Sequence, residues 1–395
     1  QLAAGALEVL MADSVVDNVD GLGIGARSRV YGNLYLEAGT TAAYMLTGQY
    51  TASSREKYAA SSHSAVMLLS GYVPSATLVS IAADRNKEYV NKERKQVFQL
   101  PDDPGITESV KKYTYVTSDY ALGAINQFDQ VSGLTSLRKP HSIYEGVSTW
   151  VPQGHQEMPW SLYFAGTQAS LIFDSHPRGS EQELTGQHNY WTGDVGCLDA
   201  RYFQEENVLL GMHHITRANE LQFTHFYIPK GRFEETVEKN GWIFIKQGRV
   251  YVAIKPLKDS TVSNEAQYSW VTAGAYANSE IRIDSPDTAL VCEVVNESQY
   301  TKGFEQFQKD VAANPLTYST SGDYQIEYTG LNGKTLTLDY GNSQNRIDGN
   351  AVDYGAYKLY DSPYMQSDWG SGTVDILYNG KGLRINLKGE MTELG

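Results

Sequence analysis

Imidazole, amide and aromatic side chains are concentrated between Gln153 and Trp191, in segments that short apolar runs separate. Aromatic rings stack on the apolar faces of sugars and amides bond hydroxyl groups. An imidazole can accept or donate a proton near neutral pH. The mixture favours a groove that holds a carbohydrate, with His155 and His188 facing the sugar. The side chains expected to bind it are Gln153, Gln156, Trp160, Asn189, Tyr190 and Trp191.

A second set of reactive side chains, Arg27, Arg29 and Tyr31, follows a glycine-rich turn. Alternate residues of an extended segment share one side, so the three would point the same way. Arginine binds a carboxylate through two parallel hydrogen bonds, and nearby positive charge favours the phenolate form of a tyrosine. The trio is suited to hold and process an acidic sugar. The structural alternative is an ordinary helix entry with surface arginines.

Two adjacent histidines, His213 and His214, lie on a predicted strand and should point to opposite faces. One of them is therefore expected in the core. The other, with His225 on the next predicted strand and a carboxylate, could bind a divalent metal; apart from this alternative, no cofactor is expected. A hydrolase would need two carboxyl groups at a defined separation. Glu157 and Asp194 are the first candidates, although their spacing does not mark them as a pair.

The composition limits the kinds of partner that the protein is expected to bind. The 395 residues carry a formal net charge of −14, which argues against nucleic acid or an anionic membrane. No apolar run is long enough to predict a membrane span. Tyrosine outnumbers phenylalanine by 28 to 11, as on sugar-binding surfaces and on water-exposed β-sheets. The spacing of Cys197 and Cys292 leaves a disulfide between them undecided.

The order of patterns along the chain predicts an α+β multidomain protein. Residues 1–95 show helical periodicity, residues 96–315 form a series of strands, and residues 316–395 form a smaller β-module. The charged residues 92–95 are expected to link the helical region to the strands. Short helices are expected at Arg232–Lys239 and at Thr301–Ala313, where Phe304, Phe307 and Val311 lie on one face. Because helices and strands are segregated, a doubly wound α/β fold is disfavoured. The first residues already have a helical pattern, so we expect the chain to be part of a longer protein.

This layout resembles polysaccharide lyases of the heparinase II/III and hyaluronate-lyase type. The segments that carry the resemblance are RSRVYG at 27–32, GHQEMPWSLYF at 154–164, GQHNYWTG at 186–193 and the stretch 224–254. It implies a partial α/α toroid, a large antiparallel β-supersandwich and a small C-terminal β-sandwich. It also implies an extracellular or periplasmic location. A complete toroid needs more helices than 1–95 can hold, so a second chain carrying the rest of it is an open expectation.

The resemblance implies cleavage of a uronic-acid polysaccharide by β-elimination. In that reaction a base removes the proton next to the uronate carboxylate, a cation or amide neutralises the carboxylate, and an acid protonates the leaving oxygen. Carried over by residue type, Tyr31 would be base and acid, Arg27 or Arg29 would hold the carboxylate, and His155 or His188 would assist. A glycoside hydrolase and a non-catalytic carbohydrate-binding protein remain the alternatives.

Overall fold

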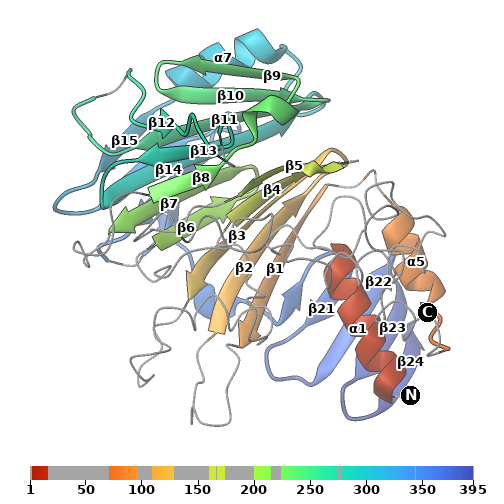
Figure 1. Ribbon diagram of the computed structural model, residues 1–395. Helices are drawn as coiled ribbons and strands as arrows, with labels where there is room; N and C mark the ends of the chain where they lie inside the picture. Colours follow the sequence, from red (N-terminus) through yellow and green to blue (C-terminus); the bar gives the residue numbers. More distant parts are fainter. Residues whose placement is uncertain are drawn as a thin grey trace.

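The computed structural model describes the chain in segments: residues 2–16, 71–84, 86, 88–96, 109–128, 160–165, 167–173, 200–214, 224–262, 264–274, 277–342 and 344–394. These residues form mostly antiparallel strands, arranged in three sheets, together with three α-helices (Figure 1). The helices are α1 (Leu2–Val16), α5 (Ala76–Ala83) and α7 (Phe304–Ala313). The coarse expectation of large antiparallel sheets is therefore confirmed.

The longest sheet has 13 strands among the described residues, and every neighbouring pair in it is antiparallel. In sheet order the strands are β12 (Ser269–Trp270), β13 (Glu280–Ile283), β8 (Thr224–Tyr227), β5 (Thr167–Phe173), β4 (Trp160–Phe164), β3 (Tyr120–Phe128), β2 (Ser109–Val116), β1 (Tyr89–Gln96), β20 (Tyr360–Asp361), β21 (Met365–Ser367), β22 (Thr373–Tyr378), β23 (Lys381–Asn386) and β24 (Glu390–Leu394).

Two smaller sheets complete the layers. The six-stranded sheet has the order β6 (Ala200–Glu205), β7 (Val208–His214), β14 (Asp287–Asn296), β11 (Val250–Leu257), β10 (Trp242–Gln247) and β9 (Glu235–Lys239). The five-stranded sheet has β15 (Leu316–Ser319), β16 (Gln325–Thr329), β17 (Thr335–Asp339), β18 (Arg346–Ile347) and β19 (Asn350–Ala351). Two single 3₁₀ turns, η3 (Lys230–Arg232) and η4 (Tyr354–Ala356), interrupt the connections.

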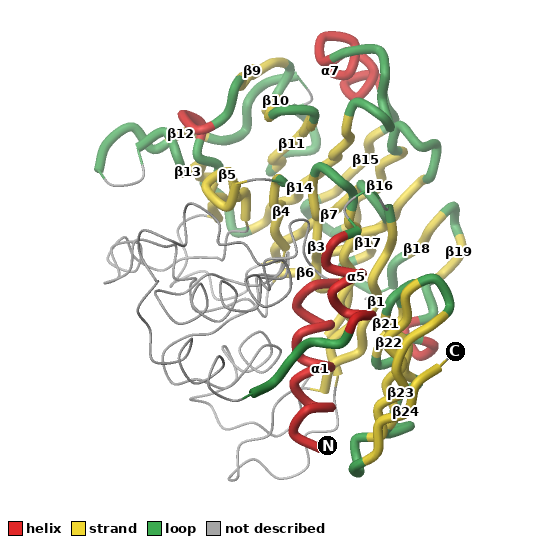
Figure 2. The backbone as a smooth tube through the Cα atoms, turned by 90° about the vertical axis from the view of Figure 1, so that its right-hand side faces the viewer, coloured by secondary structure: helices red, strands yellow, loops and turns green. Residues whose placement is uncertain are grey.

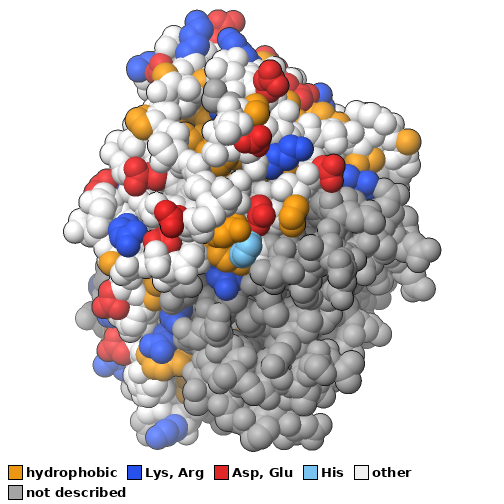
Figure 3. Space-filling model, turned by 90° about the vertical axis from the view of Figure 1, so that its left-hand side faces the viewer, with side chains coloured by type: hydrophobic (Ala, Val, Ile, Leu, Met, Phe, Trp, Pro, Cys, Tyr) orange, Lys and Arg blue, Asp and Glu red, His pale blue; other side chains and the backbone are white. Residues whose placement is uncertain are grey.

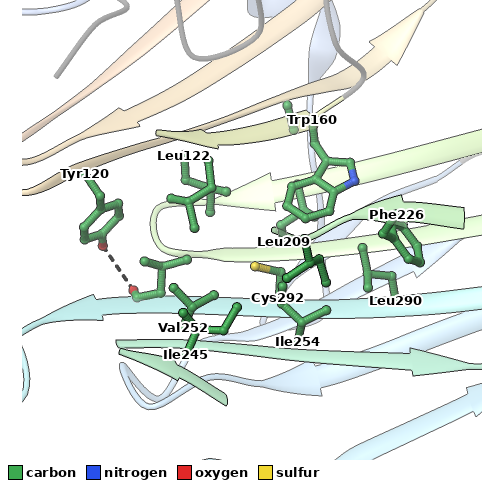
Figure 4. Close-up of a cluster of buried hydrophobic side chains, with 14 of the residues drawn as sticks. Tyr120, Leu122, Trp160, Leu209, Phe226, Ile245, Val252, Ile254, Leu290 and Cys292 are labelled. Atoms are coloured by element: carbon green, nitrogen blue, oxygen red, sulfur yellow. Dashed lines mark hydrogen bonds between the residues drawn. The ribbon is translucent and has the colours of Figure 1, made fainter. Parts of the chain in front are cut away.

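The main core lies between the long sheet and the six-stranded sheet. Successive side chains of a strand point to opposite faces, so Leu122 and Trp160 of the long sheet meet Cys292 and Ile254 of the six-stranded sheet (Figure 4). The Tyr120 hydroxyl reaches across this core and donates to the Val294 carbonyl at 3.1 Å, the dashed line in Figure 4. Cys292 is a buried free thiol, and Cys197 lies outside the described residues.

A second core lies on the opposite face of the six-stranded sheet, where α7 packs on β10 and β11 and the five-stranded sheet covers β6 and β7. The predicted helix at Thr301–Ala313 is confirmed as α7, which begins at Phe304. Its expected apolar face is also confirmed, because Phe304, Phe307 and Val311 are all buried. The six-stranded sheet is thus the middle of three layers.

The helical toroid expected in residues 1–95 does not appear among the described residues. Instead α1 and α5 lie side by side against β21–β24 (Figure 2). Their buried side chains, among them Val15 and Ile81, pack on Val374 and Ile376 of β22, so a sheet covers this apolar surface of the two helices.

The charged segment at residues 92–95, expected as a link after the helical region, is instead part of strand β1. Glu93 pairs in register with Lys112 of β2, and the Lys112 ammonium lies 3.5 Å from the Glu93 carboxylate. Both side chains are buried. A buried charge needs an opposite charge or hydrogen bonds, and the neighbouring strand supplies it. Charge compensation across strands therefore explains why this polar segment is a strand.

The last residues of the chain are divided between two sheets. Residues 316–351 supply the five-stranded sheet, whereas residues 360–394 extend the long sheet beyond β1. The structure therefore differs from the separate β-sandwich expected for 316–395. The helix predicted at Arg232–Lys239 is wrong, because Glu235–Lys239 is strand β9 and pairs with β10. Backbone bonds to β10 outweigh the helical spacing of its apolar residues.

Candidate functional site

Most of the side chains predicted to bind or process a sugar lie outside the described residues. These are Arg27, Arg29, Tyr31, Gln153, Gln156, His155, His188, Asn189, Tyr190 and Trp191, together with the hydrolase candidates Glu157 and Asp194. Trp160 is described: its ring is fully buried in the main core and lies 6.3 Å from the ring of Phe226. In this position the indole fills space between two sheets and presents no surface to a ligand.

The two adjacent histidines point to opposite faces of β7, as the strand pattern predicted. His213 is buried in the main core, where its ring nitrogens lie 3.2 Å from the Tyr202 hydroxyl and 3.2 Å from the Thr288 hydroxyl. His214 faces the other way, toward the five-stranded sheet. The expectation that His225 lies on a strand next to β7 is wrong, because His225 is on β8 of the long sheet whereas β7 belongs to the six-stranded sheet.

His214 forms a dyad with Asp287. The two residues are directly opposite in the antiparallel pairing of β7 with β14. His214 Nδ1 lies 2.7 Å from Asp287 Oδ1, and each side chain is 30% exposed. A carboxylate on Nδ1 favours the tautomer that carries the proton there, which leaves Nε2 as an acceptor. The dyad therefore presents an oriented imidazole at the edge of the layers.

Two phenol rings lie beside His214 of the dyad, and a guanidinium lies over one of these rings. The ring centroid of Tyr324 lies 4.0 Å from that of His214, and the Tyr340 ring stands edge-on at 5.7 Å. The Arg201 guanidinium lies over the Tyr340 ring at 5.1 Å, so its charge and the imidazole share this ring as a neighbour. Figure 3 shows a face of the molecule where a histidine lies at the surface beside acidic, basic and hydrophobic side chains.

Backbone geometry fixes the dyad from two sides. Tyr324 has φ +46°, in the left-handed region that costs about 1 kcal/mol or more for a residue with a side chain. The Tyr340 N–H donates to the Tyr324 carbonyl at 3.0 Å and holds this conformation. On the other side, the Ser285 hydroxyl accepts from the Asp287 N–H at 3.1 Å.

Two absences hold for the described segments. Within them, no group of three or more histidine, cysteine, aspartate or glutamate side chains is placed to hold a metal ion. None of the helices described is long and apolar enough to cross a membrane.

Comparison of the chain with known protein families, with curated proteins and with solved structures finds no match. The geometry of the dyad and its neighbours is therefore the basis for a functional proposal.

Proposed function

We propose that the protein cleaves a uronic-acid polysaccharide by β-elimination, with His214 as the proton-transferring group. The observation that carries this proposal is the His214–Asp287 dyad, which is partly exposed and flanked by two phenol rings, one of which has the Arg201 guanidinium over it. An imidazole can move a proton, the rings suit a sugar face, and a guanidinium suits a carboxylate. The large antiparallel sheets are of the kind that the family resemblance implies.

In the proposed reaction, Arg201 binds the uronate carboxylate and so makes the proton on the adjacent ring carbon more acidic. Nε2 of His214 takes that proton. The electron pair left behind forms a carbon–carbon double bond as the neighbouring carbon–oxygen bond to the next sugar breaks. The proton passes from the imidazolium to the departing oxygen, so atoms and charge balance without another reactant. Asp287 stabilises the imidazolium during the transfer.

The side chains predicted outside the described residues remain predictions for the same substrate. Tyr31, Arg29, His155 and His188 would act on the same acidic polysaccharide, which is the expected partner. An extracellular or periplasmic location fits a polymer of this size, and no bound cofactor is required by the reaction as written. The dyad is the part of such a site for which the structure gives contacts.

The test is turnover of a panel of uronic-acid polysaccharides, followed by the near-ultraviolet absorbance of the unsaturated product. Wild type should generate this product, and His214→Gln should lower kcat by about 10²–10⁴-fold, the usual size of a general acid–base contribution. Arg384→Gln is a control, because it removes an exposed ion pair to Asp375 on β22 and should leave turnover unchanged. Full activity in His214→Gln would remove the imidazole from the mechanism. Saturated products would indicate a hydrolase, and binding without products a carbohydrate-binding protein.

A further inference from the structure

A cavity of about 320 Å³ with a mixed polar and apolar wall lies under the loop that joins β11 to β12. The polar and aromatic side chains of its wall include Lys258, Asp259, Gln267, Tyr268, Arg282 and Asp284. The cavity is within the size range of small-molecule sites. Its wall combines hydrogen-bond donors, acceptors and one phenol ring, as a hydroxylated ligand would require.

The loop over the cavity is held in one conformation. Gln267 is buried, its side-chain oxygen accepts from the N–H groups of Lys258 and Asp259 at 2.7 Å each, and its amide nitrogen donates to the Val262 carbonyl at 2.7 Å. From the opposite side, Gly241 approaches so closely that an added Cβ would lie 2.6 Å from the Glu265 carbonyl oxygen. A loop fixed on both sides keeps the cavity formed without a ligand, which lowers the entropic cost of binding.

The charges in the wall disfavour an anionic ligand. Asp259, Glu265 and Asp284 face two cations, Lys258 and Arg282. The Arg282 charge is already compensated, because its Nε donates to the carboxylate of fully buried Glu280 at 2.7 Å. The carboxylate of an anionic ligand that entered this cavity would therefore meet uncompensated negative charge from the wall. An uncharged ligand could use the same carboxylates as acceptors for its hydroxyl groups.

The cavity and the dyad lie at the same end of the sheets, on either side of the start of β14. Asp284 of the cavity wall lies in the short connection between β13 and β14, and Asp287 of the dyad is the first residue of β14. Three residues of extended chain span at most about 10 Å. On the other side, Lys258 directly follows Leu257, which pairs with Ala289 of β14. A chain of sugars bound at the dyad would therefore reach the cavity with a nearby unit.

We infer that the cavity is a binding subsite for an uncharged, hydroxyl-rich sugar unit, and that Asp259 and Asp284 exclude a charged unit from it. Its role beside the dyad rests on the proposed function, whereas its binding of a neutral sugar does not. In the bound state the carboxylates of the wall accept from sugar hydroxyls, Lys258 donates to a sugar oxygen, and the Tyr268 ring contacts the sugar face. The Tyr268 hydroxyl is held by Glu238 at 2.9 Å, which fixes that ring.

The experiment measures binding of a neutral methyl glycoside and of the matching uronate at the cavity by NMR titration, followed at the backbone amide signals of Gln267 and Tyr268, in wild type and in His214→Gln. Both proteins should bind the neutral glycoside equally, and the uronate about tenfold more weakly, as expected for a nearby like charge. Asp284→Ala should weaken binding of the neutral glycoside severalfold, and Asp284→Asn should narrow the gap between the two ligands. The control is Asp368→Asn, at an exposed ion pair with Lys358 on the segment before β22.

The two proposals fail separately. Neutral glycoside binding that survives His214→Gln, in a protein without lyase activity, would support the cavity and remove only the proposed reaction. Tighter binding of the uronate than of the neutral glycoside would overturn the inference, as would Asp284→Ala without effect. Because Asp284 is exposed, these variants should fold, and unchanged thermal unfolding would verify it.

Discussion

Two carboxylates on the same face of β14 have opposite surroundings. Asp287, at the start of the strand, is 30% exposed and faces an imidazole. Glu293, further along the strand, is fully buried under the five-stranded sheet. Its oxygens accept from the Tyr328 hydroxyl at 2.5 Å and from the Leu331 N–H at 2.7 Å. Position along one strand therefore separates a carboxylate that can serve a ligand from one that joins two layers.

The electrostatic consequences differ in the same way. Burial raises the pKa of Glu293 to about 7, although its hydrogen bonds from Tyr328 and Leu331 lower it in part. Burial also raises the pKa of Tyr328 far above its ordinary value, and the nearby Glu293 adds to this effect. An ionisable pair in this position makes the docking of the two sheets sensitive to pH. The dyad, in contrast, remains open to solvent and to proton exchange.

The largest expected effect is on kcat, when each of the two carboxylates is replaced by its amide. Asp287→Asn should lower kcat by about 10²-fold or more, because the amide lacks the charge that stabilises the imidazolium and its NH₂ group can donate to Nδ1, which favours the wrong tautomer. Glu293→Gln should leave kcat unchanged. The measurement is the rate of unsaturated product formation under saturating substrate. Equal losses in both variants would mean that the contrast between the two carboxylates is wrong.

The next effect is on stability. Glu293→Leu removes the acceptor of both the Tyr328 hydroxyl and the Leu331 N–H, which stay buried, and should cost about 2–5 kcal/mol. Asp287→Leu should cost less, since its partners reach water. The free energy of unfolding in urea provides the comparison. A Glu293→Leu protein as stable as wild type would show that the polar link between the sheets contributes nothing.

The pH dependence of stability should follow Glu293. Its pKa rises from 4.5 in the unfolded chain to about 7 in the folded protein. The folded state therefore binds the proton more tightly, so this contribution is complete below pH 4.5 and is lost as the pH rises through 7. The loss should amount to roughly 3 kcal/mol between these limits. Urea unfolding at pH 5 and pH 8 would measure it, and Glu293→Gln should abolish this part of the difference.

The smallest expected effect concerns the strained ring beside the dyad. Tyr324→Asn keeps a residue that tolerates positive φ and removes the phenol ring from His214. Relief of strain should offset the lost packing, so the free energy of unfolding should change by less than about 1 kcal/mol. KM should rise severalfold, because the sugar loses a stacking surface. An unchanged KM would restrict Tyr324 to a structural role.

The sequence predicted those features that depend only on residues close together in the chain. The apolar spacing at Phe304, Phe307 and Val311 identified α7 and its buried face. Period-two alternation placed His213 and His214 on opposite faces of β7. Both inferences use residues within a few positions of each other. They needed no knowledge of which strands pair.

The sequence did not predict contacts that depend on which distant strands pair with each other. The His214–Asp287 dyad exists because β7 and β14 pair in one register, and nothing near Asp287 in the chain indicates that register. The same limit applies to β1, whose charged residues suggest a link until Lys112 is placed opposite Glu93. Trp160 was expected in a sugar groove because its neighbours are polar, whereas its strand directs the ring into the core.

The contact between α1 and the last strands has a consequence for biosynthesis. Val15 and Val16 of α1 belong to the same buried cluster as Ile376 of β22 and Ile385 of β23, and Figure 1 shows α1 beside these strands. A ribosome makes α1 long before those strands emerge. The side of the helix that packs on β22 and β23 must wait uncovered throughout that interval. The nascent polypeptide therefore offers a chaperone-binding segment early, and this contact closes only after β22 and β23 have been made.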